Sequence, residues 1–485
     1  MYIRIFVLAV LTLVSSAWAH AARATSVLLH DVRVIDGNGG KPIEHADVLI
    51  TGSKIASVTD LSVAKAETQP KRKKTPSNTP VITLTGKTVL PGLISDHSHL
   101  GFVNGVTTSG NNVTRANILR QLRQYTAYGV TTVTSLGLNL KPFYDVQPQA
   151  HSGATRTADV FGADRGFGVP NGAPPASLGI LDTQVYRPTT PEEARSEVRE
   201  TAQRHPDLIK IWVDDLHGAA TKMNPEVYKA VIDEAHANGI RVAAHVYYLE
   251  DAKQLVGDSV DILAHGVRDT VVDEDFINAI KGRAAWYVPT LSLDESAYLF
   301  AEHPDWLKDP FLRRGLQPSL AAQLNDPAWR KKVLADTKTV AAQKQAVATN
   351  MKNVKTLFDA GVNVGFGTDS GATPLRIAGF AEHRELKLLT EAGLTPLQAI
   401  QTATKNAALL LHLNNRGVIA AGKLADLLVV DGDPSKDITA LDHVESVWRR
   451  GKQVSDATWF KPHLARHEPA ARVASRIRSA AEITR

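Results

Sequence analysis

The 485-residue chain contains no cysteine. This absence excludes disulfide bonds and thiolate ligands, so any bound metal must be held by histidine, carboxylate or a less common ligand. The hydrophobic share of 43% and the charged share of 22% are ordinary for a globular protein, which excludes a chain that is disordered throughout. The length allows a large barrel and a smaller second domain.

Long hydrophobic runs are absent after the first residues. Arg4, an apolar run over residues 5–14 and small residues up to Ala21 have the order of a secretory signal peptide. The apolar run is too short for a stable membrane-spanning helix. We therefore predict a signal peptide in residues 1–21, cleaved after Ala19 or Ala21, and a periplasmic or secreted protein with no stable membrane span. An N-terminal anchor is the alternative.

A continuous basic surface is not expected either, although the formal net charge is +5. The excess positive charge is concentrated in Lys71-Arg72-Lys73-Lys74 and in a basic C-terminal tail over residues 459–485. Such runs are typical of solvated loops and tails. Neither run shows the interleaved aromatic residues of a nucleic-acid-binding face, so we expect no nucleic-acid partner.

Both ends of the chain contain short strand-like segments separated by turns. These segments lie at residues 27–36, 46–50, 54–58 and 81–90, and again at residues 422–433 and 444–448. Short alternating runs bounded by glycine are typical of β-strands. We predict one small β-sandwich built from residues 22–90 and 414–458, with a second domain inserted between its two halves.

The insert, residues 91–413, alternates strand-like and helix-like segments, which is typical of a parallel α/β sheet. Its strand-like segments are residues 93–99, 129–135, 159–163, 208–213, 241–245, 259–265, 286–290 and 362–369. Eight strands are the number that a (β/α)8 TIM-like barrel requires. In such barrels the active site lies at the C-terminal ends of the strands, so the residues there are the candidates for function.

Side chains that can ligate a metal stand at several of these strands. They are His97 and His99 at the first, Lys210 in the fourth, His245 at the fifth, His265 at the sixth and Asp369 at the eighth. Residues two apart on a strand share a face, so the first two histidines can bind one ion together. A single-ion site needs fewer ligands, and the set therefore predicts two ions about 3.5–4 Å apart. For Lys210 taken alone, an ion pair with Asp214 or Asp215 is the simpler interpretation.

Several motifs together resemble the amidohydrolase superfamily, in its branch of amidases and dipeptidases near imidazolonepropionase. The motifs are Pro91-Gly92-Leu93-Ile94 with His97-Ser98-His99, Ile209-Lys210-Ile211, Ala244-His245, Ala264-His265-Gly266, Gly367-Thr368-Asp369, residues 393–400 with 403–408, and residues 422–426. The resemblance covers nearly the whole chain after the predicted signal peptide, as far as Val454.

The resemblance implies a carboxylated Lys210 whose carbamate bridges two divalent ions, with zinc as the expected metal. His97, His99 and Asp369 would hold one ion together with this lysine, and His245 and His265 would hold the other. A hydroxide bridging the ions would attack the substrate carbonyl, and Asp369 would move a proton to the leaving amine. Imidazolonepropionase resembles a one-metal enzyme without this lysine, so Lys210 indicates the two-metal branch.

Three residues are candidates for contact with the substrate. Tyr247 shares its side of the fifth strand with the histidine there and can either donate to a developing oxyanion or be an ordinary rim aromatic. Arg268 can bind a substrate carboxylate or pair with Asp269. Arg165 lies in the glycine-rich segment 164–172 after the third strand, which is predicted to line the pocket.

The sequence allows more than one interpretation of two further features. The long segment 291–361 between the last two strands can be a lid, an additional packing element or an oligomer contact. His205, His217, His236 and His383 fall in helix-like or loop-like segments, where surface or capping roles are expected.

These observations predict an exported, metal-dependent hydrolase that cleaves the amide bond of small N-acyl amino acids, dipeptides such as Xaa-Pro, or ochratoxin-like amides, and that forms homo-oligomers. A hydrolase of cyclic amides or a deaminase is the alternative, distinguished by whether ammonia or an amine plus carboxylate is released. A non-catalytic scaffold barrel is a third interpretation, although such relatives typically lose ligands that this chain keeps.

Overall fold

The computed structural model describes residues 25–63 and 76–456. The predicted signal peptide, the run Lys71-Arg72-Lys73-Lys74 and the basic C-terminal tail therefore lie outside the described residues. Within the described ranges, no helix combines the length and hydrophobicity that crossing a bilayer requires.

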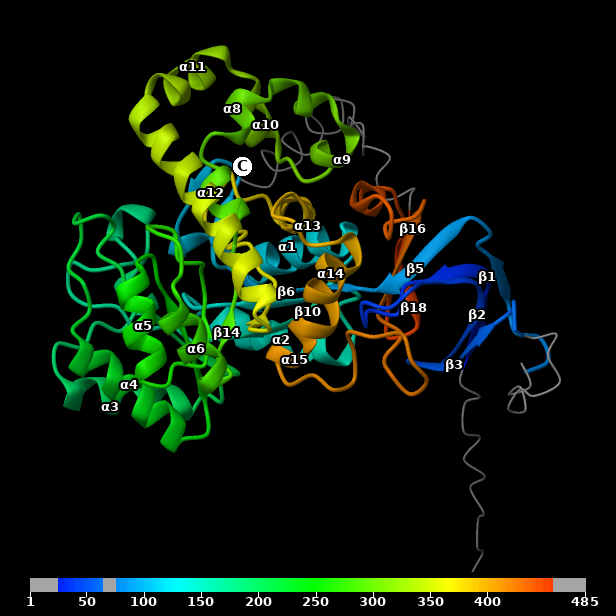
Figure 1. Ribbon diagram of the computed structural model, residues 1–485, viewed down its shortest axis with the longest axis horizontal. Helices are drawn as coiled ribbons and strands as arrows, with labels where there is room; N and C mark the ends of the chain where they lie inside the picture. Colours follow the sequence, from blue (N-terminus) through cyan, green and yellow to red (C-terminus); the bar gives the residue numbers. More distant parts are fainter. Residues whose placement is uncertain (1–24, 64–75, 457–485) are drawn as a thin grey trace, which may run out of the picture.

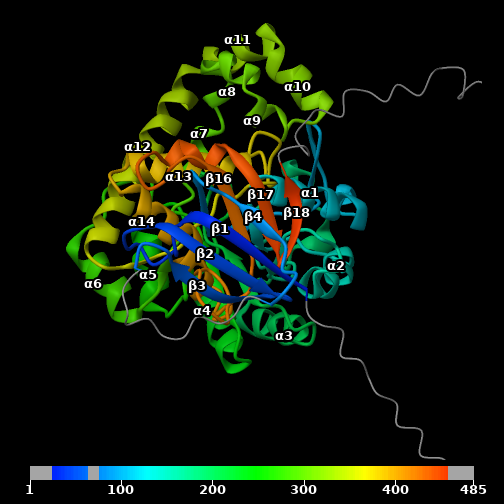
Figure 2. The same cartoon turned by 90° about the vertical axis from the view of Figure 1, so that its right-hand side faces the viewer.

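Strands from both ends of the chain form one eight-stranded sheet, which faces the viewer in Figure 2. Its strands are β1 (Ser26–Val34), β2 (Ile43–Thr51), β3 (Lys54–Asp60), β4 (Val81–Thr83), β5 (Lys87–Pro91), β16 (Leu427–Asp431), β17 (Val444–Arg449) and β18 (Lys452–Asp456). The order is β18-β17-β16-β5-β1-β2-β3, and β4 pairs with β1. The two chain ends meet where β5 and β16 pair antiparallel, for example at Val89 and Val429.

The predicted sandwich differs from this arrangement, because hydrogen bonds join the strands into one sheet rather than two. Strand β1 explains the difference: one of its edges pairs with β2, and the other pairs first with β4 and then with β5. The sheet has a core of its own, in which Leu29, Val48, Val89, Leu427 and Trp448 are all buried.

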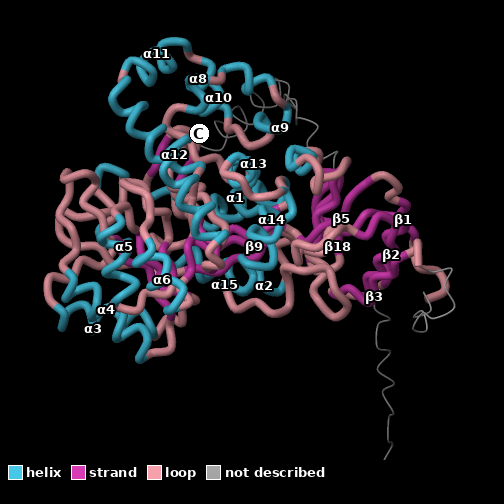
Figure 3. Tube along the Cα trace, viewed as in Figure 1, coloured by secondary structure: helices cyan, strands magenta, loops and turns pink. Residues whose placement is uncertain are grey.

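Eight parallel strands occupy the middle of the chain. Figure 3 draws strands in magenta and the helices around them in cyan. The eight strands are β6 (Leu93–Ser98), β9 (Val130–Ser135), β10 (Asp159–Gly162), β11 (Leu208–Trp212), β12 (Arg241–His245), β13 (Ile262–Leu263), β14 (Trp286–Tyr287) and β15 (Asn363–Val364). Each lies within the segment that the sequence predicts for it. Small antiparallel β7 (Val103–Asn104) and β8 (Thr107–Thr108) stand outside this set.

The eight strands follow the order of a TIM barrel, but they form two ladders instead of one continuous closed sheet. One ladder is β10-β9-β6 and the other is β11-β12-β13-β14-β15. At one seam Ala163 bridges to Leu208, and at the other Ser98 bridges to Ser370. The closed barrel that the sequence predicts is therefore not found among the described residues: at both seams isolated bridges stand where a continuous ladder would be needed.

Helices connect these strands and lie outside them (Figure 1). The first six are α1 (Arg115–Ala127), α2 (Lys141–Ser152), α3 (Pro191–Ala202), α4 (Pro225–Ala237), α5 (Leu249–Gly257) and α6 (Glu274–Arg283). Thr114 caps α1, and Thr190 followed by proline begins α3, as helix-start rules predict. After β15, α13 (Phe380–Glu391), α14 (Pro396–Gln401) and α15 (Ala407–Leu410) lead back to the sheet of the chain ends.

The long segment between β14 and β15 is largely helical and forms the lobe at the top of Figure 1. Its helices are α7 (Ser292–Glu295), α8 (Leu299–Glu302), α9 (Pro310–Arg313), α10 (Pro318–Asn325), α11 (Pro327–Ala335) and α12 (Thr337–Asp359). Leu299, Phe311 and Leu320 share one buried cluster with Tyr128 and with Phe380 of α13. This shared core favours the packing interpretation for α8 to α10.

Four buried charges join the sheet of the chain ends to the barrel strands. Arg416 Nη1 lies 2.8 Å from Asp159 Oδ2 of β10, and Arg449 Nη1 of β17 lies 2.9 Å from Asp426 Oδ2. Arg449 also approaches Asp159 at 3.8 Å. Because all four side chains are nearly inaccessible to solvent, each charge depends on its partners.

Candidate functional site

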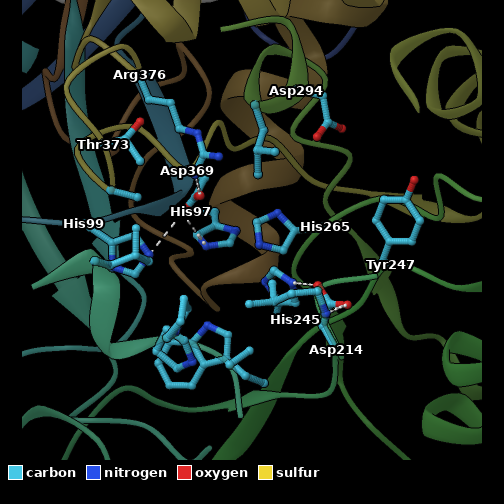
Figure 4. A pocket seen from close by; sticks show the side chains of 18 of the residues that line it. His97, His99, Asp214, His245, Tyr247, His265, Asp294, Asp369, Thr373 and Arg376 are labelled. Atoms are coloured by element: carbon cyan, nitrogen blue, oxygen red, sulfur yellow. Dashed lines mark hydrogen bonds and ion pairs between the residues drawn. The ribbon is translucent and has the colours of Figure 1, made fainter. Parts of the chain in front are cut away.

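A cavity of about 250 Å³ lies at the C-terminal ends of the barrel strands. Five of the predicted metal ligands line it, namely His97, His99, His245, His265 and Asp369. They lie at the ends of β6 and β12 and in the segments that follow β6, β13 and β15, so parts far apart in the sequence meet here (Figure 4).

His97, His99 and Asp369 form a group that could hold a metal ion, since one ligand atom of each lies within 4.8 Å of the others. Asp369 Oδ1 lies 3.3 Å from Nε2 of His97 and 3.0 Å from Nε2 of His99. All three residues are buried. Two imidazoles and a carboxylate are ligands that suit zinc and similar divalent ions.

Asp369 is fixed by its backbone and by an arginine. Its φ of +58° lies in the left-handed region that residues other than glycine rarely adopt. Its amide donates to the carbonyl of His97 at 3.0 Å. Arg376 donates from Nη1 to Asp369 Oδ2. One carboxylate oxygen therefore faces the two histidines, and the other is held by the guanidinium.

His245 and His265 each use one ring nitrogen for a hydrogen bond within the protein. Nε2 of His245 lies 2.9 Å from Asp214 Oδ2, and Nδ1 of His265 lies 2.9 Å from Thr290 Oγ1. Nδ1 of His245 and Nε2 of His265 are thereby left for a metal. The two ring centres are 4.4 Å apart. Such partners orient a metal-binding histidine and fix its tautomer.

Lys210 of β11 is fully buried, and its Nζ has no hydrogen-bond partner among the described residues. Burial lowers the pKa of this amine to about 7. Neither neighbouring aspartate pairs with it, because Asp214 binds His245 and Asp215 accepts a hydrogen bond from Tyr248. A buried amine without a partner is costly. Lys210 therefore fits a site in which a bound group supplies the partner that its amine lacks.

The electrostatics of the cavity suit metal ligation. Burial, aided by the positive charge of Lys210, lowers the pKa of His97 to about 3. Burial also lowers the pKa of His245 and of His265. It opposes ionisation of Asp369, but Arg376 and the histidines outweigh it and hold the pKa of Asp369 well below its usual range. Neutral imidazole and ionised carboxylate are the forms that bind metals.

Arg268 and Tyr247 line the same cavity. The Arg268 guanidinium lies over the Tyr247 ring, 4.8 Å from its centre, and its Nη1 is 3.4 Å from each carboxylate oxygen of Asp294. Its Nε has no partner among the described residues. Asp269 does not pair with it, since that carboxylate accepts the amide of Leu249. Arg268 Nη2 donates to the Val246 carbonyl at 3.0 Å, and the long contacts to Asp294 leave Nη1 and Nε able to bind an anionic group.

The remaining wall of the cavity is mainly apolar. It includes Phe102, Leu138, Pro174, Leu178, Trp212 and Leu216. A wall of this kind suits an uncharged, apolar part of a ligand, while the few polar side chains fix its orientation.

The structure gives Arg165 no place in the cavity wall. Its guanidinium lies over the ring of Tyr186, 4.8 Å from the centre, and 3.8 Å from Glu200 of α3. The aromatic ring and the carboxylate satisfy the charge away from the cavity. The predicted lining segment 164–172 is displaced as well, because the wall there is made by residues of 173–178.

Two histidines also differ from their expected surface positions. His217 lines the cavity, with its ring 4.5 Å from that of Tyr247. His383 is buried in α13, where it bonds the Tyr128 carbonyl at 2.7 Å and Asp442 at 3.0 Å. The helical pattern around His383 could not show that its face is covered by another segment.

Sequence reasoning missed Asp214, Thr290 and Arg376 as parts of the site. The first two follow β11 and β14 closely, so their position after a strand was an available signal. Arg376 lies in an irregular turn after Asp369, where no pattern indicates a contact.

Known proteins are similar to this chain over most of its length. A profile of the amidohydrolase family matches residues 88–454. Ochratoxinase of Aspergillus niger is 24% identical over 473 residues, which cover 90% of this chain and 88% of that protein. Imidazolonepropionase of Deinococcus radiodurans is 25% identical over 414 residues, covering 82% and 88%.

Solved structures share the fold. The crystal structure of A. niger ochratoxinase has a TM-score of 0.68 at 20% identity and covers 91% of this chain and 98% of that chain. A Xaa-Pro dipeptidase with bound methionine in its active site has a TM-score of 0.66 at 23% identity, covering 88% and 99%. The likeness shows a common α/β architecture of the TIM-barrel type.

Proposed function

The chain belongs to the amidohydrolase family of metal-dependent hydrolases, and we propose that it cleaves the amide (C–N) bond of small molecules with the help of two divalent ions. The observation that carries the proposal is the meeting of five possible ligands in one cavity, next to a buried lysine amine that has no hydrogen-bond partner among the described residues.

The ligands divide into two groups. His97, His99 and Asp369 would hold one ion, and the free ring nitrogens of His245 and His265 would hold the other. Lys210, carboxylated to a carbamate, would bridge them. Zinc is the expected metal for imidazole and carboxylate ligands. When bound, the ions would lower the pKa of a water between them and polarise the substrate carbonyl.

Two side chains would act on the reacting atoms. Asp369 would accept the proton of the attacking water and pass it to the leaving amine, while Arg376 holds its second oxygen. Tyr247 lies on the cavity wall, and its hydroxyl makes no hydrogen bond to the described residues. Burial raises the pKa of Tyr247, which keeps this group a donor that can stabilise charge on the carbonyl oxygen.

The cavity favours a substrate with one apolar half and one anionic half. The apolar wall would hold the acyl group, and Arg268 would bind a carboxylate on the amine side. Small N-acyl amino acids, dipeptides such as Xaa-Pro and ochratoxin-like amides have this form. The similarity to ochratoxinase and to a Xaa-Pro dipeptidase supports this class.

A second candidate function is hydrolysis of a cyclic amide or deamination, which the similarity to imidazolonepropionase favours. Deamination would release ammonia, ring opening would give a single product, and amide cleavage would give an amine and a carboxylate. A non-catalytic scaffold barrel would need none of the ligands that this chain retains.

Turnover by purified protein reloaded with zinc, cobalt or manganese tests the proposal, with N-acyl amino acids, dipeptides and lactams as substrates. We expect an amine and a carboxylate as products. Lys210→Ala and Asp369→Asn should abolish turnover and keep the wild-type circular dichroism spectrum. Near-normal turnover in either variant, or no turnover of any substrate by the reloaded wild type, would contradict the proposal.

Export to the periplasm or medium and assembly into homo-oligomers stay predictions of the sequence. N-terminal sequencing of the protein recovered from an exporting host would show whether cleavage follows Ala19 or Ala21. The elution volume of that protein in size-exclusion chromatography would give the number of chains in the oligomer.

A further inference from the structure

Helix α13 brings a buried carboxylate close to the candidate metal site. Glu382, in its first turn, has no exposed surface. Its Oε2 accepts the backbone N–H of Gly379 at 2.7 Å. Its Oε1 accepts three hydroxyl groups, from Ser95 at 3.0 Å, Thr368 at 2.7 Å and Ser370 at 2.7 Å. One carboxylate therefore receives four hydrogen bonds from the protein.

The three hydroxyl groups belong to the two segments that carry the possible ligands of the first ion. Ser95 lies on β6, two residues before His97, and the other two hydroxyls flank Asp369 on either side. At the seam between these segments Ser98 bridges to Ser370, and backbone N–H groups of Asp96 and Asp369 donate to the carbonyls of Phe366 at 2.6 Å and His97 at 3.0 Å. Glu382 adds a side-chain link across that seam.

The hydroxyl groups of Thr368 and Ser370 need Glu382 as the acceptor for their hydrogens. Tyr125 Oη lies 2.6 Å from Ser370 Oγ, and the amide of Ser370 donates to Thr368 Oγ1 at 3.1 Å. The Thr368 hydroxyl oxygen thus already accepts one hydrogen bond, and its hydrogen goes to Glu382 Oε1. The Ser370 hydroxyl also donates its hydrogen to Glu382 Oε1, and its oxygen accepts from the Tyr125 hydroxyl. A carboxylate accepts at both oxygens, whereas an amide presents donors at one of its two ends.

We propose that Glu382 is a positioning residue for the metal site: it holds the turn at Asp369 against β6, so that Asp369 Oδ1 stays between the two histidines of that strand. Asp369 has a φ of +58°, and an unfavourable conformation of this kind persists only where the surroundings determine it. The inference rests on the proposed function, because it takes His97, His99 and Asp369 as ligands.

Metal affinity, measured by competition with a chelator, tests the inference independently of turnover. Glu382→Gln keeps the side-chain shape but turns an NH2 group toward either the three hydroxyls or the Gly379 amide. Thr368→Val removes one hydroxyl without changing the bulk of the side chain. We expect each variant to bind zinc about 10- to 100-fold more weakly than the wild type, the range usual for groups that orient metal ligands.

Asp442→Asn is the matched control, because Asp442 anchors the same helix through His383 and Lys387 but touches neither ligand segment. It should lower the melting temperature of the metal-free protein and leave zinc affinity within about twofold of the wild type. Unchanged zinc affinity in both Glu382→Gln and Thr368→Val, or an equal loss in Asp442→Asn, would overturn the positioning role alone. A wild-type protein that binds no zinc would overturn the metal site as well.

Discussion

At the scale of single residues, hydrogen bonds decide which ring nitrogen of His245 and of His265 is left for the cavity. His245 and His265 give opposite ring nitrogens to their partners, Asp214 and Thr290. The sequence could show that both histidines end a strand. It could not show which nitrogen stays free, because each partner comes from a neighbouring strand end.

The charge of Arg268 gives a prediction about substrate preference. Arg268→Met should raise KM for substrates with a carboxylate on the amine half by about 10- to 100-fold, since a charge-assisted hydrogen bond contributes ~1.5–3 kcal/mol. The KM for matched primary amides of the same substrates should change little. Steady-state kinetics on both series would measure the difference.

Arg165→Met serves as the control for that variant, because Arg165 lies over Tyr186 and does not line the cavity. Its kinetics should equal those of the wild type. A loss for the carboxylates in Arg165→Met, or equal losses for carboxylates and amides in Arg268→Met, would refute the assignment. Both arginines follow a strand end in the sequence, so the sequence does not distinguish their roles. The side chains around each arginine in the structure do.

At the scale of elements, the strands were predictable because short, mainly apolar runs alternate with helix-like segments along the insert. All eight barrel strands lie inside the predicted segments, although β13, β14 and β15 each keep only two residues. The pairing at the seams was not predictable, since it depends on bridges such as Ala163 to Leu208 between separate ladders. For the same reason, alternation at the chain ends could not distinguish one sheet from a sandwich.

The helical lobe after β14 gives a prediction at this scale. Phe311 is buried against Tyr128 with ring centres 4.9 Å apart. Phe311→Ala should lower the free energy of unfolding by ~3–5 kcal/mol, as is usual for a buried phenylalanine. If the lobe is a packing element, KM should stay within about twofold of the wild type.

Urea unfolding and steady-state kinetics would measure both quantities for that variant. Leu334→Ala, at a side chain that is 38% exposed on α11, should change neither. A large change in KM with unchanged stability in Phe311→Ala would instead favour a lid.

At the scale of the whole molecule, the sheet of the chain ends and the barrel strands are linked through the buried group of Asp159, Arg416, Asp426 and Arg449. Asp159→Asn should lower the free energy of unfolding at neutral pH by ~3–5 kcal/mol, because it takes the close carboxylate from the buried guanidinium of Arg416, which then has only Asp426 at 3.8 Å. Asp145→Asn, which removes an exposed pair with Lys141, should cost ~1 kcal/mol or less.

Acid stability tests the same network. Burial opposes ionisation of Asp159, but His151, Arg449 and Arg416 outweigh it and hold its pKa below the usual range. The unfolded chain therefore binds this proton more readily, so the contribution to stability is present above about pH 4 and is lost as the pH falls further. Urea unfolding from pH 7 down to pH 3 should show a steeper loss for the wild type than for Asp159→Asn. Equal slopes would contradict the role of this carboxylate.

The proposal of two ions is tested most directly by the metal content of the active protein, measured per chain by elemental analysis. Labelling with ¹³C-bicarbonate would show the signal of a lysine carbamate in the same sample. We expect about two divalent ions per chain and a carbamate signal in the wild type, with loss of the signal and of at least one ion in Lys210→Ala. A fully active wild type with a single ion and no carbamate would contradict the proposal.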